Sequence, residues 1–231
     1  MAKAIVCTFV FFITPLLFSF NGYFPNWKSI SQTYIYGYKN STVIAEINNA
    51  TSNKVAYAGF ESADNNGYWT YSTAAGATGG SLTDVGRTGI KYYNIGSGSI
   101  KRATLPAGKY FVSYWSTGTV NLSGTNYSII RQKNIPSING WAYYEYFINI
   151  TANNSSITLS GSSPVKIDEV RLYPENAQML TYTYDILIGK TSETDNNNMT
   201  IYYEYDEFNR LRYIKDHRGN IIKRYTYNIK H

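Results

Sequence analysis

The feature that most constrains the fold is a repeat of Tyr, Asp and turn residues near the C-terminal end of the sequence. A Tyr-Asp pair ends at Asp185 and again at Asp206, 21 residues later, and further Asp residues follow at Asp195 and Asp216 with the same separation. A constant period near 20 residues indicates repeated supersecondary units. A single unit cannot bury an apolar face alone, so the units are expected to stack against their neighbours.

Residues 202–215 show how one unit is built. Side chains alternate in character on both sides of a short turn, and a period of two predicts two strands joined as a hairpin. Asn209 and Gly219 occupy turn positions at which a left-handed backbone is expected, and both residue types tolerate it. The position of the repeated Asp follows the turn, so we expect it to brace that turn rather than to take part in chemistry.

The stretch from Tyr202 to Asn220 resembles the YD repeat of Rhs-type bacterial proteins, usual form YxYDxxGRLxxxxDxxGN. About two units match, and Asn209 replaces the first Gly. The earlier unit departs further, with one extra residue before Gly189 and with Asn198 in place of the second Gly. The resemblance implies β-hairpins like those that form spiralling sheets in secreted, cell-surface or toxin-delivery proteins. The residues that carry the motif are Tyr184, Asp185, Asp195, Tyr205, Asp206, Asn209, Arg210, Leu211, Asp216 and Gly219.

Residues 1–22 differ in kind from the rest. Lys3 precedes a mostly apolar run from residue 4 to residue 20, which Pro15 interrupts. This pattern predicts a helical secretory signal, and an uncleaved membrane anchor or an error in the gene start are the alternatives. Cys7, the only cysteine, lies inside the run, so no disulfide framework is expected. We therefore expect a secreted or cell-surface protein, with anchoring through residues 4–20 as the alternative.

From residue 48 to residue 174, short apolar runs alternate with turns rich in Gly and Asn, and no helical periodicity is present. Together with the 24 Tyr and 18 Gly of the chain, this predicts a β-sandwich. The order of its features, such as residues 105–115 and 141–147, resembles the galactose-binding-like jelly roll of carbohydrate-binding modules. The chain is thus predicted to be all-β. A short Rhs-like hairpin segment at 23–47 precedes the jelly roll, and YD-repeat hairpins at 175–231 follow it.

Two carboxylates form a candidate cation site in the sandwich. Asp168 alternates with Val170 and Leu172, so it is expected to point into the core, where a carboxylate must be neutralised, hydrogen-bonded or bound to a cation. Glu61 becomes its neighbour if the first and last strands of the sandwich pair. In the resembled family this corner often holds a structural Ca²⁺. A calcium ion at Glu61 and Asp168 is one prediction, and a hydrogen-bonded carboxylate without metal is the other.

Three other side chains are candidate ligand-binding residues. Carbohydrate-binding modules stack sugar rings on exposed Trp or Tyr. Trp69 and Tyr71 lie beside a loop rich in Gly and Asn, and Arg131 could line the same rim. The predicted ligand is a glycan or a cell-envelope polymer, and a structural role for these aromatic residues is the alternative.

No constellation for catalysis is evident, because His217 and His231 are the only histidines and no nucleophile motif or phosphate loop is found. We expect no enzyme. We also expect no nucleic-acid partner, since the formal charge of +6 is scattered and forms no basic helix or finger motif. The predicted function is a non-enzymatic scaffold or binding protein, with other Rhs-type or secretion components as partners. The alternative is a truncated core fragment of an Rhs-type polymorphic toxin-delivery protein, which an adjacent immunity-like gene would indicate.

The last 24 residues are strongly basic. Residues 208–231 contain seven Lys or Arg against one Asp. They predict either a solvated strand face or a surface that contacts an anionic polymer or a membrane.

Overall fold

A computed structural model describes the chain over residues 31–61, 67–71, 77–79, 86–96, 98–161 and 165–228. These residues form three antiparallel sheets, and their only helical element is the short 3₁₀ helix η1 (Ser52–Lys54). The all-β prediction is therefore confirmed for this part of the chain. Within it, no helix is long and apolar enough to span a bilayer. The signal or anchor predicted at residues 1–22 lies outside the described residues.

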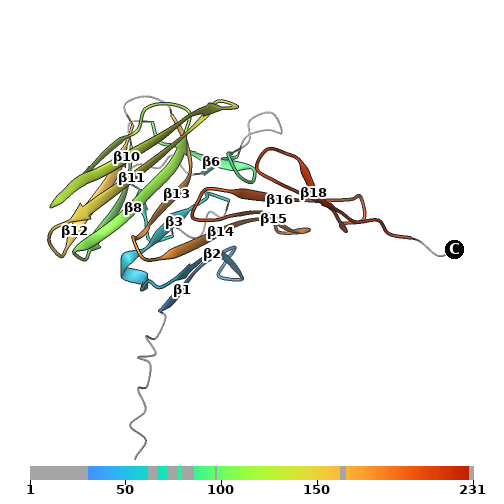
Figure 1. Ribbon diagram of the computed structural model, residues 1–231, viewed down its shortest axis with the longest axis horizontal. Coiled ribbons are helices and arrows are strands. Elements are labelled where there is room, and N and C mark those ends of the chain that lie inside the picture. The colour runs from blue at the N-terminus through green and yellow to red at the C-terminus, as the bar shows by residue number, and fades with distance from the viewer. Residues whose placement is uncertain are drawn as a thin grey trace, which may run out of the picture.

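One seven-stranded sheet, called here the hairpin sheet, is built from both ends of the described chain (Figure 1). Its strand order is β1 (Gln32–Gly37), β2 (Thr42–Asn48), β14 (Gln178–Asp185), β15 (Gly189–Thr194), β16 (Thr200–Tyr205), β17 (Leu211–Lys215) and β18 (Ile221–Arg224). Asn48 lies opposite Gln178, so β2 pairs directly with β14. The chain therefore leaves the sheet after β2 and returns to it at β14, directly beside β2. The described residues of the sequence segments 23–47 and 175–231 thus belong to one structural unit.

The intervening residues form a β-sandwich of two antiparallel sheets. The first sheet has the order β10 (Tyr127–Ile138), β11 (Trp141–Ile150), β8 (Gly108–Ser116), β13 (Lys166–Pro174), β6 (Lys91–Asn94) and β5 (Ala77–Gly79), with β3 (Ala56–Ala58) also paired to β13. The second has the order β4 (Thr70–Tyr71), β7 (Ser99–Leu105), β12 (Ser155–Ser160) and β9 (Asn121–Gly124). Val112 and Tyr114 of the first sheet share an apolar core with Ile100 and Ile157 of the second. Burial of this core is the main driving force for the sandwich.

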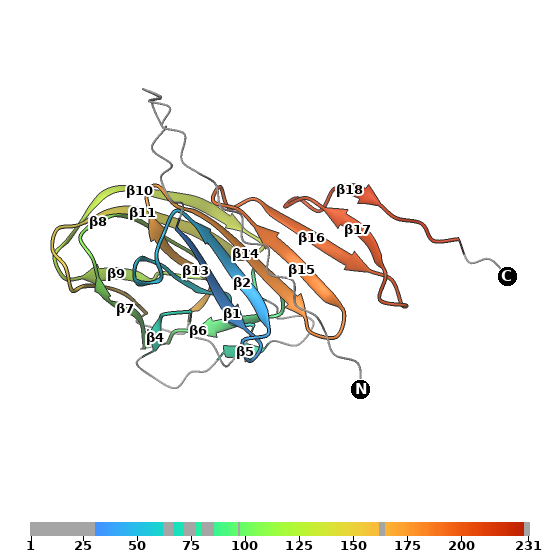
Figure 2. The same cartoon turned by 90° about the horizontal axis from the view of Figure 1, so that it is seen from below.

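The hairpin sheet forms a third layer against part of the sandwich. Ile47 and Met179 of the hairpin sheet pack with Tyr57 and Tyr173 in a second apolar cluster. Figures 1 and 2 both show β1, β2 and β14 beside the sandwich, whereas β16, β17 and β18 extend away from it. As a consequence, β13 is covered on both faces.

A β-bulge in β13 corrects the predicted orientation of Asp168. The pairing of β13 with β8 shifts between Asp168 and Arg171, and Glu169 has a φ of 53°. Because of this extra residue, Ile167 rather than Asp168 joins Val170 in the sandwich core. The Asp168 side chain is fully buried, as expected, but on the opposite face of the sheet. Side-chain alternation cannot reveal such a shift, because one inserted residue inverts it.

The repeat turns have the predicted construction. Asp206 Oδ1 accepts hydrogen bonds from the backbone N–H of Phe208 (2.9 Å) and of Arg210 (3.0 Å). Asn209 and Gly219 have φ values of 58° and 86°. Each of the other repeated aspartates, Asp185, Asp195 and Asp216, also accepts a backbone N–H of its own turn. These carboxylates brace turns, which agrees with the interpretation drawn from their spacing.

A candidate ligand cleft between the sandwich and the hairpin sheet

The site with the most varied chemistry is a cleft of about 500 Å³ at the junction of the two units. The sandwich contributes Glu61 and the segment 86–91, while the hairpin sheet contributes two of its turns and residues of β14, β15 and β16. A volume of this size suits a small ligand or part of a polymer. The lining residues are Tyr38, Glu61, Gly86, Arg87, Gly89, Ile90, Lys91, Tyr184, Asp185, Ile186, Thr191 and Tyr202.

Two buried carboxylates hold the segment 86–91 in place. Asp168 Oδ2 accepts hydrogen bonds from the backbone N–H of Arg87 (2.7 Å) and of Thr88 (3.1 Å). Asp168 Oδ1 accepts a third from Glu169 N at 2.7 Å. Thr88 Oγ1 donates to Glu169 Oε1 at 2.8 Å. The carboxylates therefore fix the backbone that carries Arg87 into the cleft.

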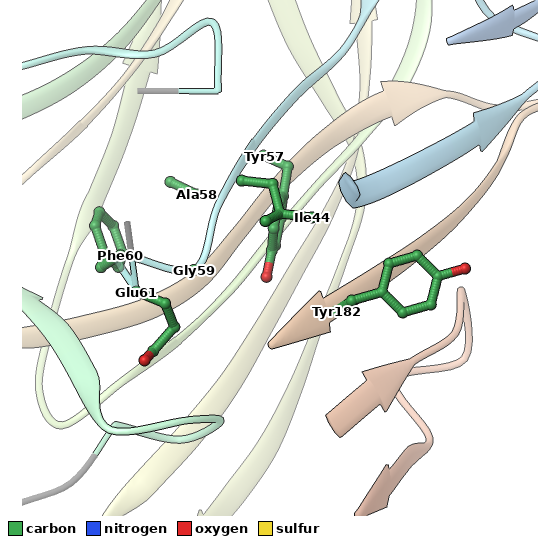
Figure 3. Close-up of a pocket in the computed structure, with 7 residues that line it drawn as sticks. All are labelled: Ile44, Tyr57, Ala58, Gly59, Phe60, Glu61 and Tyr182. Carbon is green, nitrogen blue, oxygen red and sulfur yellow. The ribbon is translucent and has the colours of Figure 1, made fainter. Parts of the chain in front are cut away.

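Glu61 fixes the other end of the same segment. Its Oε1 accepts hydrogen bonds from the backbone N–H of Ile90 (2.9 Å) and of Lys91 (2.7 Å), and Lys91 Nζ donates to the Glu61 carbonyl at 3.0 Å. A separate cavity of about 10 Å³, room for about one water molecule, also borders Glu61. Figure 3 shows the Glu61 carboxylate and the Tyr57 hydroxyl on the same side of the chain, while the Tyr182 ring points away.

Arg87 is the most distinctive cation of the cleft. Its Nη1 donates to the Tyr202 hydroxyl at 2.7 Å, and its guanidinium carbon lies 4.3 Å from the centre of the Trp115 ring. Among the described residues, Arg87 makes no salt bridge, and its buried Nε has no hydrogen-bond partner. Buried donors without a partner are rare in folded proteins, so the hydrogen bonding of this guanidinium is incomplete at the edge of the cleft.

Below the cleft, a buried ion pair connects the two units. Arg171 Nη2 lies 2.7 Å from Glu169 Oε2, and these side chains are only 3% and 2% exposed. Arg171 Nη1 donates to the Asp195 carbonyl in a repeat turn at 2.7 Å, and Thr181 Oγ1 donates to Glu169 Oε2 at 3.0 Å. Tyr57 completes the network with a hydrogen bond of 2.7 Å to Glu169 Oε1. The network satisfies both charges, which is what makes their burial tolerable.

The electrostatics of these acids differ with their partners. Burial raises the pKa of Glu61 to about 7, against the lowering effect of the Lys91 and Ile90 amides. Burial, reinforced by the charge of Glu169, also raises the pKa of Asp168 well above its usual range. Burial acts on Glu169 in the same direction, but the Arg171 charge and three side-chain hydrogen-bond donors outweigh it and lower the pKa of Glu169. Desolvation raises the pKa of Tyr38 to about 12, so its hydroxyl stays protonated at neutral pH.

The predicted aromatic platform is wrong in this structure. Trp69 is only 2% exposed and belongs to the sandwich core, where its Nε1 donates to the Val170 carbonyl at 3.4 Å. Tyr71 is packed against Phe60 and Tyr93. Arg131 is exposed on β10 of the other sheet, with its guanidinium near the Phe147 ring. A loop rich in Gly and Asn beside Trp69 therefore did not indicate an exposed ring.

The calcium prediction has a geometric difficulty. The expected pairing of the first and last sandwich strands exists, with Ala58 opposite Val170, and it brings Glu61 close enough for its charge to raise the pKa of Asp168 further. However, three N–H donors already occupy the Asp168 oxygens. In the part of the chain that the structure describes, no group of three His, Cys, Asp or Glu residues could hold a metal ion. The described residues thus fit a hydrogen-bonded carboxylate better than a calcium site.

Most residues of the cleft carried no separate signal in the sequence. Arg87 and Lys91 lie outside any motif, and Tyr38 belongs to the turn after β1. Tyr202 and Tyr184 do lie in the repeat, but their spacing indicates only that they belong to strands and does not predict that they line a cleft. Comparison with known protein families finds no match, and no curated protein matches the chain either.

Proposed function

We propose that this chain is a secreted or cell-surface binding scaffold without enzymatic activity, in which the cleft between the sandwich and the hairpin sheet binds a carbohydrate. The proposal includes membership of the Rhs-type YD-repeat group, on the strength of the motif at residues 202–220. It also includes a galactose-binding-like sandwich, since a jelly roll of this kind would suit the observed antiparallel strands. The ligand site, however, is placed beside the sandwich and not on Trp69.

The observation that carries the proposal is the mixture of groups in the cleft. Arg87 and Lys91 can donate hydrogen bonds, Glu61 and Asp185 can accept them, and the tyrosine hydroxyls can do both. Sugar hydroxyls donate and accept in the same way. The rings of Tyr38 and Tyr202 and the exposed side chains of Ile90 and Ile186 add apolar surface for the faces of a sugar ring.

The chemistry of the cleft also supports a binding role over catalysis. Glu61 is its acid with a raised pKa, but Glu61 already accepts two backbone N–H groups that position the segment 86–91. No described histidine lines the cleft, since His217 lies in a repeat turn. We therefore assign Glu61 a positioning role.

The test uses the full chain on a panel of neutral polysaccharides in affinity gel electrophoresis. We expect retention by at least one polysaccharide, and a loss of about tenfold in affinity for Arg87→Gln and for Tyr202→Phe, because each removes one polar contact. Tyr36→Phe is the matched control, since Tyr36 is 41% exposed on β1 and is not part of the cleft. Retention that is unchanged in both cleft variants would exclude this site, and absence of retention on every polysaccharide would exclude the carbohydrate.

A further inference from the structure

We propose a second, separate binding site at the far end of the hairpin sheet, where a groove of about 490 Å³ binds an acidic polysaccharide that carries carboxylate or sulfate groups. The groove lies where the segment 224–227 runs beside β17 and the turn that precedes it. Figure 2 shows β17 and β18 far from the sandwich. This groove, called here the basic groove, has no lining residue in common with the cleft. The two sites are connected only because both lie on the hairpin sheet.

Three arginines line the basic groove, and two of them supply its net charge. Arg210 is neutralised locally, because Asp206 Oδ2 lies 2.9 Å from its Nε and 2.8 Å from its Nη2. Arg212 and Arg224 are exposed, and neither forms a salt bridge with any described residue. Glu207 is the remaining acid of the lining, so the groove keeps a positive balance around these two guanidiniums, both of which lie near the Tyr213 ring. Arginine binds planar oxyanions with two parallel hydrogen bonds, which makes carboxylate and sulfate its best matches.

Aromatic side chains supply the second part of the site. Phe208 is 63% exposed and Tyr227 is 44% exposed. Arg210 lies between them, with its guanidinium carbon 5.1 Å from the Phe208 ring centre and 4.5 Å from that of Tyr227. The arginine holds both rings at the surface by cation–π contact. Exposed apolar side chains that lie together, unlike single ones, mark interaction sites.

An acidic polysaccharide matches both features, since its anionic groups suit the free arginines and its ring faces suit Phe208 and Tyr227. Single-stranded nucleic acid offers a similar combination, as does an anionic membrane surface. We favour the polysaccharide because the apolar run at residues 4–20 predicts export, which would place the groove among cell-surface polymers. The other two ligands become outcomes of the test.

The experiment measures binding of the full chain to polygalacturonate and dextran sulfate, with uncharged dextran as the reference. We expect binding to an acidic polymer that weakens as NaCl is raised, and a loss of about tenfold or more in Arg212→Gln/Arg224→Gln, which removes two charge-assisted contacts. Phe208→Ala should reduce binding without lowering the melting temperature, because the ring is mostly exposed.

The matched control is Lys101→Gln/Lys133→Gln, which removes two exposed charges from the sandwich and should leave binding within about twofold of wild type. Equal losses in both double variants would mean a general charge effect and would overturn the site. Binding that does not change in Arg212→Gln/Arg224→Gln would do the same. Tighter binding of an oligonucleotide or of anionic phospholipid vesicles, lost in that variant, would overturn the polysaccharide. The cleft variants Arg87→Gln and Tyr202→Phe should retain acidic-polymer binding, so failure of either site can be recognised independently.

Discussion

The central strand and the edge strand of the hairpin sheet use the same repeat in different surroundings. On the central strand β15, Ser192 and Thr194 are 1% exposed, whereas on the edge strand β18 Ile221 and Ile222 are 55% and 60% exposed. The turn after β15 and the turn before β17 are braced by an Asp in the same manner. The repeat therefore determines the backbone conformation, and the surroundings of each strand determine whether its side chains are buried or exposed.

Two acid–arginine pairs of the molecule also differ in their surroundings, and this difference affects their contribution to stability. Glu169 and Arg171 are almost completely buried between the layers, whereas Asp206 and Arg210 are 17% and 35% exposed. An exposed pair contributes little, because water screens its charges. A buried pair is different: it adds little to stability as a whole, but the loss of one partner leaves an uncompensated charge. Similar chemistry should thus give very different responses to mutation.

The largest expected effect is therefore at Arg171. We expect Arg171→Met to lower the free energy of unfolding by about 3–5 kcal/mol, because Glu169 would remain buried without its cation. Arg210→Met should have a much smaller effect. Urea unfolding followed by circular dichroism measures both. The double variant Glu169→Gln/Arg171→Met should recover part of the loss, and equal effects of Arg171→Met and Arg210→Met would contradict the comparison.

An intermediate effect is expected from Glu61 as the pH changes. Its pKa in the folded state is raised by burial to about 7, from 4.5. The unfolded chain therefore releases this proton first, and the stabilising contribution present below pH 4.5 is lost as the pH rises through 7. Because Glu61 is partly exposed, we reduce the expected size to about 1–2 kcal/mol. Unfolding free energies measured across this interval should depend less on pH in Glu61→Gln, and identical profiles would disprove the assignment.

Repeating these melts in millimolar calcium tests the cation predicted at Glu61 and Asp168. We expect no rise in the melting temperature, since the Asp168 oxygens already accept three N–H groups. A rise in wild type that is absent in Asp168→Ala would instead establish a metal site.

The smallest effects should come from two equivalent turn residues, Asn198 and Asn209. Both have positive φ values, 60° and 58°, which glycine adopts without strain. Asn198 Oδ1 also accepts a hydrogen bond of 3.0 Å from Trp115 Nε1 of the sandwich. We expect Asn198→Gly to destabilise the chain by about 1 kcal/mol and Asn209→Gly to change stability by less than about 0.5 kcal/mol. Thermal melts measured side by side would show this difference, and the reverse order would mean that the Trp115 contact is unimportant.

The sequence predicted the strands better than their environments. In the sandwich, the stretch at residues 141–147 that stood out in the sequence lies within β11, whereas β7 and β9 did not stand out as strands. Polar residues such as Lys101 and Asn121 make the alternation of apolar and polar side chains in these two strands difficult to recognise. The error at Trp69 has another cause. Proximity in sequence to a stretch rich in Gly and Asn says nothing about the direction of a side chain, and here the ring points into the core. The error at Asp168 came from a bulge that cannot be seen in the alternation.

The sequence by itself determined the antiparallel strands, the hairpin turns and the role of the repeated Asp, because these depend on local alternation and on residues that tolerate a left-handed backbone. Only the tertiary structure decided that β2 pairs with β14 and that the hairpin sheet covers β13. The junction of these layers creates the cleft around Arg87 and buries the Glu169–Arg171 pair. Contacts across this junction, such as the one between Arg87 and Tyr202, join residues more than 100 positions apart, and no local pattern encodes them.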